Sequence, residues 1–256
     1  MRNYHPKIFL LLALLILTII TTLSAFKGQS RKTARQDKDV PTPIQEGVMT
    51  EKQREHGKLY PPSPRGKKLS DYPNGIDIVI GLPLPEKSNS DRTASSFEFL
   101  ERMACDADAV VLGTVGNKSS QLTEKGDFIF TDYGLRVEEV LKNNPAASIQ
   151  SSDTITVTRP GGAVSLNGQI YRVKDKSFGN LQPGKTYLLF LGFIPNTKSY
   201  QSINSEGGFL IGGNAVLRLT DAPSPYTLEN EKDGAAFINQ VRAASANCGK
   251  KEGGAK

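Results

Sequence analysis

From Ala109 to Leu219 the sequence is a succession of short runs rich in β-branched and aromatic residues, and a turn signal closes each run. The turn signals are Asn-Asn-Pro, Pro-Gly-Gly, Asn-Gly, Gln-Pro-Gly, Pro-Asn and Gly-Gly. The runs read ADAVVLGTV, GDFIFTDYGLRVEEVLKN, DTITVTR, GQIYRVKD, KTYLLFLGFI, KSYQSI and GFLIGGNAVLRL. Many short strands at this spacing are typical of a β-sandwich or a small β-barrel. The sequence therefore predicts a mainly β domain.

The second run predicts a long strand with an irregular middle. Phe128 and Phe130 alternate with polar residues, and Leu135 and Val137 do the same further on. Gly134 interrupts the run between these two pairs. A glycine inside a strand pattern often marks a bulge or a sharp coil. We therefore expect the strand to bend at this point.

A helix is predicted on each side of the strands. Ser95-x-x-Glu98 is a capping box that begins a short helix. Apolar residues at helical spacing near the carboxyl end predict a second helix that stops at Gly249. The folded domain is accordingly predicted over residues 93–248, and residues 249–256 are predicted to be a disordered tail.

These runs also resemble a known family. ADAVVLGTV, FTDYGLRVEEVLKN, ITVTRPGGAV, LQPGKTYLLFLGF and a final strand that begins Gly-Phe are similar to bacterial relatives of the netrin-like OB fold, which also contains the tissue inhibitors of metalloproteinases. The resemblance extends from about Ala104 to Leu219. It implies a small OB-like Greek-key barrel of five strands, in which both sheets share the long glycine-kinked strand. The animal inhibitors bind the zinc of a protease through an amino-terminal cysteine, which this chain lacks, so no inhibitory residue is transferred.

The amino-terminal segment predicts a membrane helix. The 19 residues from Ile8 to Phe26 carry no charge, and Arg2 and Lys7 precede them. At about 1.5 Å per residue they nearly span a hydrocarbon core of about 30 Å. Residues 1–26 are either a signal peptide, with Leu-Ser-Ala as the cleavage site, or an uncleaved anchor.

The membrane orientation rests on two opposing signals. Four basic residues follow the apolar run within nine positions, and the positive-inside rule places that side in the cytoplasm. A signal-like segment at the amino terminus, however, usually directs export of the downstream domain. We give export more weight, which predicts a single-pass cell-membrane protein with its carboxyl-terminal domain outside the cytoplasm, or a secreted protein after cleavage.

Charge and proline content set residues 27–92 apart. Residues 27–70 contain 11 Lys and Arg against 5 Asp and Glu, whereas residues 71–256 contain 19 against 21. The segment is therefore predicted to be a basic, Pro-rich and largely disordered linker. Two local elements are expected in it, a short helix in EGVMTEKQREHGKLY and an edge strand in which Ile76, Ile78 and Ile80 alternate. Because the basic excess lies outside the folded domain, no nucleic-acid partner is expected.

The Pro160-Gly161-Gly162 sequence raises the question of a ligand loop. A phosphate-binding loop opens a helix, but here an extended run, QIYRV, comes next. A turn or bulge at a barrel rim is therefore favoured, and a binding loop at that rim remains the alternative. The candidate rim-loop binding residues are Arg159, Gly161, Gly162, Asn196 and Tyr200.

The two cysteines, Cys105 and Cys248, allow one disulfide between the ends of the two predicted helices, or two unpaired thiols. Export favours the disulfide. A catalytic cysteine is disfavoured because His5 and His56, the two histidines of the chain, both precede the predicted domain. No catalytic residue, metal site or cofactor is predicted.

The resulting functional expectation is a non-enzymatic binding or interaction module of the cell envelope. Its partner would be a protein or a glycan, and residues 8–26 would attach it to the membrane. One alternative is a protease inhibitor that acts through an exposed loop, Asn196 to Ser205. The other is an enzyme whose site is not visible in the sequence.

Overall fold

The computed structural model describes residues 40–44, 49–60, 67–80, 95–204, 206–212, 215–220 and 233–252. No helix within these ranges is both long enough and apolar enough to span a membrane. The predicted membrane segment, residues 8–26, lies outside the described residues. The structure is mainly β with a carboxyl-terminal helix, as the sequence predicted.

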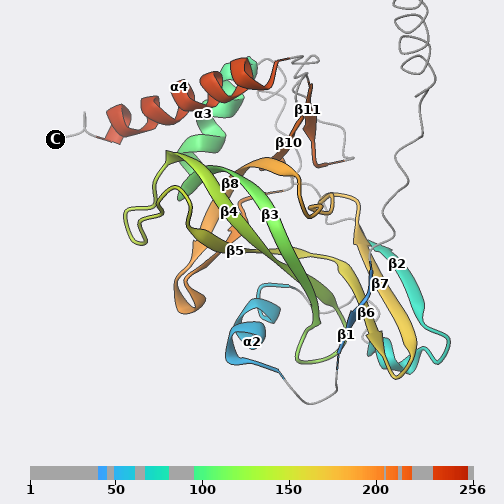
Figure 1. Cartoon of the computed structure of the whole chain (residues 1–256). Helices are drawn as coiled ribbons and strands as arrows, with labels where there is room; N and C mark the ends of the chain where they lie inside the picture. Colours follow the sequence, from blue (N-terminus) through green and yellow to red (C-terminus); the bar gives the residue numbers. More distant parts are fainter. Residues whose placement is uncertain are drawn as a thin grey trace, which may run out of the picture. The chain divides into compact units, whose positions relative to one another are not determined.

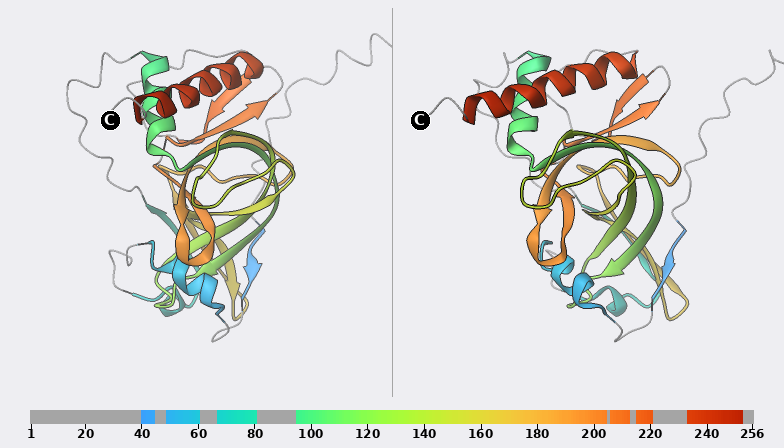
Figure 2. Two further views of the ribbon diagram at one scale, coloured as in Figure 1. Left: turned by 90° about the vertical axis from the view of Figure 1, so that its left-hand side faces the viewer. Right: turned by 60° about the vertical axis from the view of Figure 1, so that its left-hand side comes forward.

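Five strands pair in a closed ring, and Figure 1 labels four of them, β3, β4, β5 and β8. In the ring β8 pairs with β3, β3 with β4, β4 with β5, β5 with β9, and β9 returns to β8. The β5–β9 pairing is parallel and the other four are antiparallel. Figure 2 gives two more views of this ring. The strands are β3 (Ala109–Leu122), β4 (Ile129–Lys142), β5 (Thr154–Pro160), β8 (Thr186–Ile194) and β9 (Ser199–Ser202).

Further strands extend this ring and add a second sheet. β10 pairs with the first half of β8, from Tyr187 to Leu189, and β11 pairs with β10. A separate four-stranded sheet has the order β1-β6-β7-β2, in which β1 and β2 run parallel to their neighbours. The additional strands are β1 (Thr42–Pro43), β2 (Ile76–Ile80), β6 (Gly162–Leu166), β7 (Gln169–Asp175), β10 (Gly208–Gly212) and β11 (Ala215–Arg218).

The irregularity expected at Gly134 is present. The register between β3 and β4 shifts there, so that two residues of β3, Gly116 and Asn117, stand opposite Gly134. A Cβ atom at Gly134 would lie 2.1 Å from Oδ1 of Asn117. A side chain at this position would therefore require the Asn117 side chain to move, and the bulge increases the coiling of both strands.

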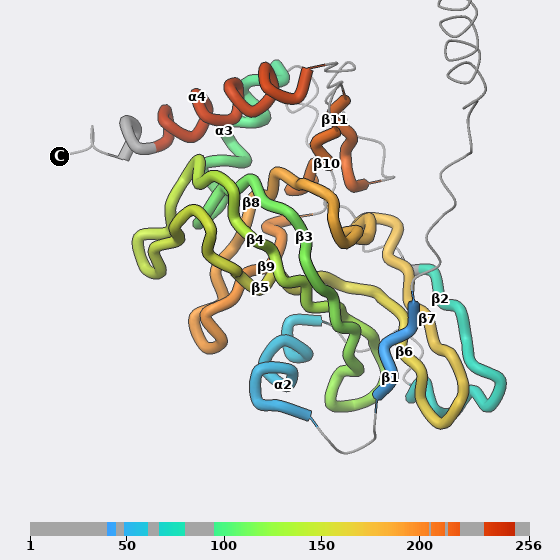
Figure 3. Tube along the Cα trace, viewed as in Figure 1, coloured from blue at the N-terminus to red at the C-terminus, as the bar shows by residue number. Residues whose placement is uncertain are grey.

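Three hydrophobic clusters hold these layers together. One fills the ring, and Tyr133, Leu135 and Leu189 belong to it. A second lies where helices α3 (Ser96–Asp106) and α4 (Gly234–Glu252) cover the outer side of β3, β8 and β10. A third packs the small sheet against the β3–β4 hairpin. The tube in Figure 3 shows the two helices crossing beside β8, on a different side of the ring from α2 (Glu51–Gly57).

The carboxyl-terminal helix is longer than predicted. It runs to Glu252, so the expected stop at Gly249 is wrong. A glycine lowers helix stability by about 1 kcal/mol but does not end a helix by itself. The predicted disordered tail 249–256 therefore begins inside α4, and residues 253–256 lie outside the described part.

The linker prediction is wrong for the parts of residues 40–80 that the structure describes. They form β1, α2, the 3₁₀ turn Leu69–Asp71 and β2, and the side chains of His56 and Leu69 are buried. The edge strand predicted at Ile76–Ile80 is present and pairs with β7. The other residues of 27–92 lie outside the described ranges. The short helix expected in EGVMTEKQREHGKLY is also present, as α2. β1 and the 3₁₀ turn were not predicted because elements of two or three residues carry no apolar period of their own, and β1 is held by pairing with β6 of the small sheet.

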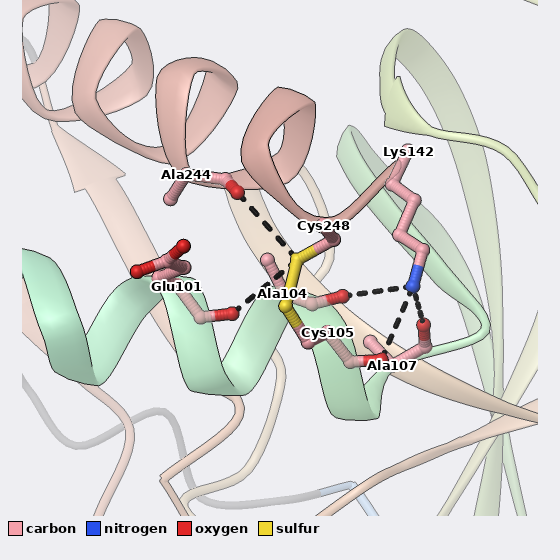
Figure 4. Close-up of a disulfide and its surroundings, with 7 residues drawn as sticks. All are labelled: Glu101, Ala104, Cys105, Ala107, Lys142, Ala244 and Cys248. Carbon is pink, nitrogen blue, oxygen red and sulfur yellow. Dashed lines mark hydrogen bonds between the residues drawn. A yellow bond between two sulfur atoms is a disulfide. The ribbon is translucent and has the colours of Figure 1, made fainter. Parts of the chain in front are cut away.

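The disulfide expectation is confirmed. Cys105 at the end of α3 is bonded to Cys248 in α4, with 5.3 Å between their Cα atoms (Figure 4). Beside it, Nζ of Lys142 donates to the carbonyl oxygens of Ala104 and Ala107 at 2.9 and 2.6 Å. A lysine at this position supplies hydrogen bonds to carbonyls that the end of a helix leaves unpaired.

Candidate ligand-binding face

The outer face of β4 and β5 is covered by helix α2. The helix begins at Thr50, whose hydroxyl accepts from the backbone N–H of Gln53 while the Gln53 side chain accepts from that of Thr50. Nζ of Lys52 donates to Oγ1 of Thr156 on β5 at 2.8 Å. After the helix, the ring of Tyr60 stacks on Phe130 of β4 with 5.6 Å between centroids. These contacts fix α2 across the two strands.

His56 is the centre of this attachment. Its side chain is fully buried, and Nδ1 lies 2.8 Å from Oδ1 of Asp132 on β4. On the other side of the ring, Nε2 lies 2.7 Å from Oγ of Ser199 and 3.0 Å from Oγ1 of Thr197. A carboxylate can only accept, so in the neutral ring Nδ1 carries the proton and Nε2 accepts from a hydroxyl.

Ser199, His56 and Asp132 are arranged like the nucleophile, the base and the orienting carboxylate of a catalytic triad. No such set is predicted from the sequence, where His56 falls in the linker and outside the folded domain. The structure corrects that point, since α2 brings His56 between Ser199 and Asp132. Ser199 has no exposed surface, however, and its hydroxyl is held by both His56 and Thr197. The arrangement is therefore well suited to fixing α2 and poorly placed for attack on an external substrate.

A cavity of about 390 Å³ lies beside α2, at the turn of the β3–β4 hairpin. Its size falls in the range of about 300–1,000 Å³ that is usual for ligand sites. The turn is rigid, because Oγ1 of Thr123 donates to Asp127 at 2.7 Å and the backbone of Leu69 donates to Gly126 at 2.8 Å. The lining residues are Ile44, Met49, Gln53, Arg54, Lys68, Ser70, Gln121, Leu122, Thr123, Glu124, Lys125, Gly126 and Leu166.

The lining of this cavity combines apolar with polar surface, and its charged side chains are mostly basic. Three cations, Arg54, Lys68 and Lys125, face one carboxylate, Glu124. Glu124 lies 3.6 Å from Nε of Arg54, which also contacts Glu51. The local charge is therefore positive, although residues 71–256 as a whole carry more acidic than basic side chains. No residue of this cavity was among the site residues predicted from the sequence.

Arg159 lies inside the barrel and not on its rim. It shares the inward face of β5 with Val157, stands opposite Thr131 of β4, and is 2% exposed. Its guanidinium lies over the ring of Phe178, 5.1 Å from the centroid. Nε, Nη1 and Nη2 are all buried without a hydrogen-bond partner among the described residues. Burial lowers the pKa of Arg159, and neighbouring groups, Tyr133 foremost, oppose that shift.

The Pro-Gly-Gly sequence forms the passage from β5 to β6. Gly161 and Gly162 have φ values of +89° and +141°. A Cβ atom on Gly162 would lie 2.2 Å from Oγ1 of Thr131 and 2.5 Å from Oγ of Ser120. No helix starts there, so the structural interpretation as a turn explains both glycines.

The other two predicted rim residues lie elsewhere. Asn196 is exposed, and its Nδ2 donates to Oε2 of Glu55 on α2 at 3.4 Å. Tyr200 is 2% exposed and its hydroxyl donates to the carbonyl of Ala147, so the expectation that it is available at the rim is wrong. The segment predicted as an inhibitory loop instead contains β9, and Ser205 lies outside the described residues.

Among the described residues, the cavity beside α2 offers a place for a ligand, and Arg159 carries buried donors without an acceptor. Within the described ranges, no three His, Cys, Asp or Glu side chains come together as ligands for a metal ion. A comparison with models of known protein families finds no match, and neither does a comparison with curated protein sequences.

Proposed function

We propose that the chain is a non-catalytic binding module of the cell envelope, built on an OB-like barrel. The strand circuit supports the fold assignment. If β3, β4, β5, β8 and β9 are numbered 1 to 5, the order around the ring is 1-2-3-5-4, with strands 3 and 5 parallel. This order is the Greek-key arrangement that the resemblance implies, and such barrels bind ligands through their loops.

Location outside the cytoplasm is supported by the disulfide. A bond between Cys105 and Cys248 persists in oxidising compartments and is rare in the cytosol. The uncharged run from Ile8 to Phe26 supplies the export signal or the anchor. Fractionation of cells, with sequencing of the mature amino terminus, distinguishes an anchored from a secreted form. A full-length soluble cytosolic protein with two alkylatable thiols would contradict the proposal.

The binding role rests chiefly on the cavity beside α2. It combines apolar residues such as Met49 and Leu166 with the cations Lys68 and Lys125. This mixture fits a partner that presents carboxylates next to apolar or sugar surface, namely an acidic segment of an envelope protein or an acidic glycan.

The test is a binding screen against acidic glycans and envelope proteins with the full chain and two variants. The double variant Lys68→Glu, Lys125→Glu reverses the charge of the cavity and is expected to weaken binding at least about tenfold. Lys185→Glu, on an exposed turn that does not line the cavity, is the matched control and is expected to bind as the unaltered chain does. Equal binding by all three proteins would place the site elsewhere.

A serine hydrolase is the second candidate function, favoured by the Ser199–His56–Asp132 arrangement. A fluorophosphonate probe reacts with serines that are activated in this way. Labelling of the unaltered chain that is lost in Ser199→Ala would favour the enzyme over the binding module. We expect no labelling, because Ser199 is fully buried.

A further inference from the structure

The guanidinium of Arg159 is a buried cation with unused hydrogen-bond donors. An arginine carries five N–H donors in one plane. In this protein all three nitrogens are buried, and none has an acceptor among the described residues. Burying a charge without hydrogen bonds is costly, and most buried arginines are paired with a carboxylate. The contact with Phe178 stabilises the cation, but it supplies no oxygen or nitrogen acceptor for the N–H groups.

We propose that Arg159 binds a carboxylate at the end of β5, next to Phe178 and beside the apolar cluster of the barrel, at a site separate from the cavity beside α2. The planar N–H edge matches the two oxygens of a carboxylate and would hold it through two parallel hydrogen bonds. Val157, Tyr133 and Tyr187 belong to the cluster that fills the ring and surround the site with apolar and phenolic groups. In these dry surroundings a charge-assisted hydrogen bond is stronger than on the protein surface.

Nearby charges favour a monoanion over a dianion. The carboxylate of Asp175 is among the groups that interact electrostatically with Arg159. Asp175 is itself buried, and its Oδ1 accepts from the backbone N–H of Ser177 at 2.8 Å. A second negative charge on the ligand would be repelled by Asp175 at low dielectric. Acetate-like groups are therefore expected to bind better than sulfate or phosphate.

The hydroxyl of Tyr187 is a further group that a ligand at this site could meet. It accepts from the backbone N–H of Gln182 at 2.8 Å, which leaves its own O–H able to donate. Burial raises the pKa of Tyr187, so the phenol keeps its proton over a wide pH range. A neutral phenol and a guanidinium can both donate hydrogen bonds to a carboxylate.

Two sources of carboxylate have to be separated, a small free acid and the carboxyl terminus of a peptide. The full chain, purified in detergent, is heated with acetate, with a short peptide acid, with the same peptide as an amide, and with sulfate. At saturation we expect the thermal midpoint to rise by about 5 °C with acetate or with the peptide acid. The amide and sulfate, at the same ionic strength, are expected to shift it by less than about 1 °C.

Two variants test whether the rise of the thermal midpoint depends on Arg159. Arg159→Met removes the buried cation, and the carboxylate response of the thermal midpoint is expected to be lost, although the variant itself is less stable because Asp175 loses the neighbouring positive charge. Arg159→Lys keeps the charge without the planar N–H edge, and it is expected to show a smaller response. Titration of the Arg159 Nε–H resonance in the unaltered chain gives a second readout that requires no variant.

The outcomes separate cleanly. A response to acetate assigns the site to small acids, and a response to the peptide acid alone assigns it to a carboxyl terminus. No carboxylate response, an equal response in Arg159→Met, or a sulfate response as large as that of acetate would each overturn the proposal. None of these results depends on the cavity beside α2, so the proposed function is tested independently.

Discussion

Replacement of His56 by alanine should release α2 from the barrel without unfolding the barrel itself. The imidazole bonds Asp132 on β4 through one nitrogen and Ser199 on β9 through the other, at 2.8 and 2.7 Å. A hydrogen bond to a charged group contributes about 1.5–3 kcal/mol, and one to a neutral hydroxyl contributes about 1 kcal/mol. Asp132 retains access to water, because its side chain is 17% exposed, so the lower end of the range applies to it.

The sum is a local destabilisation of about 2.5 kcal/mol. Because 1.4 kcal/mol corresponds to a factor of ten, the amides of residues 51–60 should exchange with solvent about 60-fold faster in the variant. The amides of β4 are held by pairing with β3 and β5 and should exchange at the same rate in both proteins. Hydrogen exchange read by mass spectrometry measures both segments in one experiment.

Two further variants test the cause of the release. Lys52→Ala removes an exposed hydrogen bond to Thr156 and should change the exchange of α2 by less than about threefold. His56→Asn retains a donor near the position of Nδ1 and should recover part of the protection. Unchanged exchange in His56→Ala would show that the buried network does not hold α2. Equal acceleration in β4 would show that helix and barrel unfold as one unit.

Two other expectations concern stability. Loss of the disulfide in Cys105→Ala, Cys248→Ala opens a loop of 143 residues. In the chain-entropy account this costs about 5 kcal/mol. Urea unfolding measures it, and a loss below about 1 kcal/mol would contradict that account. Gly162→Ala should cost about 2 kcal/mol or more, because its Cβ meets two hydroxyl oxygens within 2.5 Å. Gly168→Ala is the matched control, since its φ is +76° with nothing within 4 Å of the new Cβ, and it should cost only about 1–2 kcal/mol. Thermal unfolding compares the two, and equal costs would refute the steric argument.

The strands of the barrel were predictable because their pattern is local. Alternation around Phe128 and Leu135 marks β4, and the break between them marks the bulge opposite Gly134. The capping box at Ser95 and Glu98 marks the start of α3 for the same reason, since both partners lie within one turn. The disulfide followed from the number of cysteines and the context of export. Each of these features depends on neighbouring residues or on a single pair.

The attachment of α2 was not predictable in this way. The capping box of Thr50 and Gln53 is readable from the sequence, but nothing near His56 indicates that Asp132 and Ser199 will meet it from 76 and 143 residues away. Lysine and arginine around the helix made the segment look like a solvated linker. The histidine itself was the available signal, because burial of a lone imidazole requires partners for both nitrogens. The same limit applies to Arg159, whose inward direction depends on the register of β5.

The position of α2 also bears on where a partner can bind. The helix covers the outer face of β4 and β5 between the β3–β4 hairpin and the turn before β9, where Asn196 contacts Glu55. Lys52 of α2 is hydrogen-bonded to the hydroxyl of Thr156, and Tyr60 just after the helix is hydrogen-bonded to that of Thr158. A ligand on that face would need these two hydroxyls. A partner that needs those groups has to displace His56 from Asp132 first. The cavity beside α2 requires no such displacement, because Gln53 and Arg54 of the docked helix form part of its wall. A ligand bound there would contact helix and hairpin together, so its binding should increase the protection of α2 and should weaken when His56 is replaced.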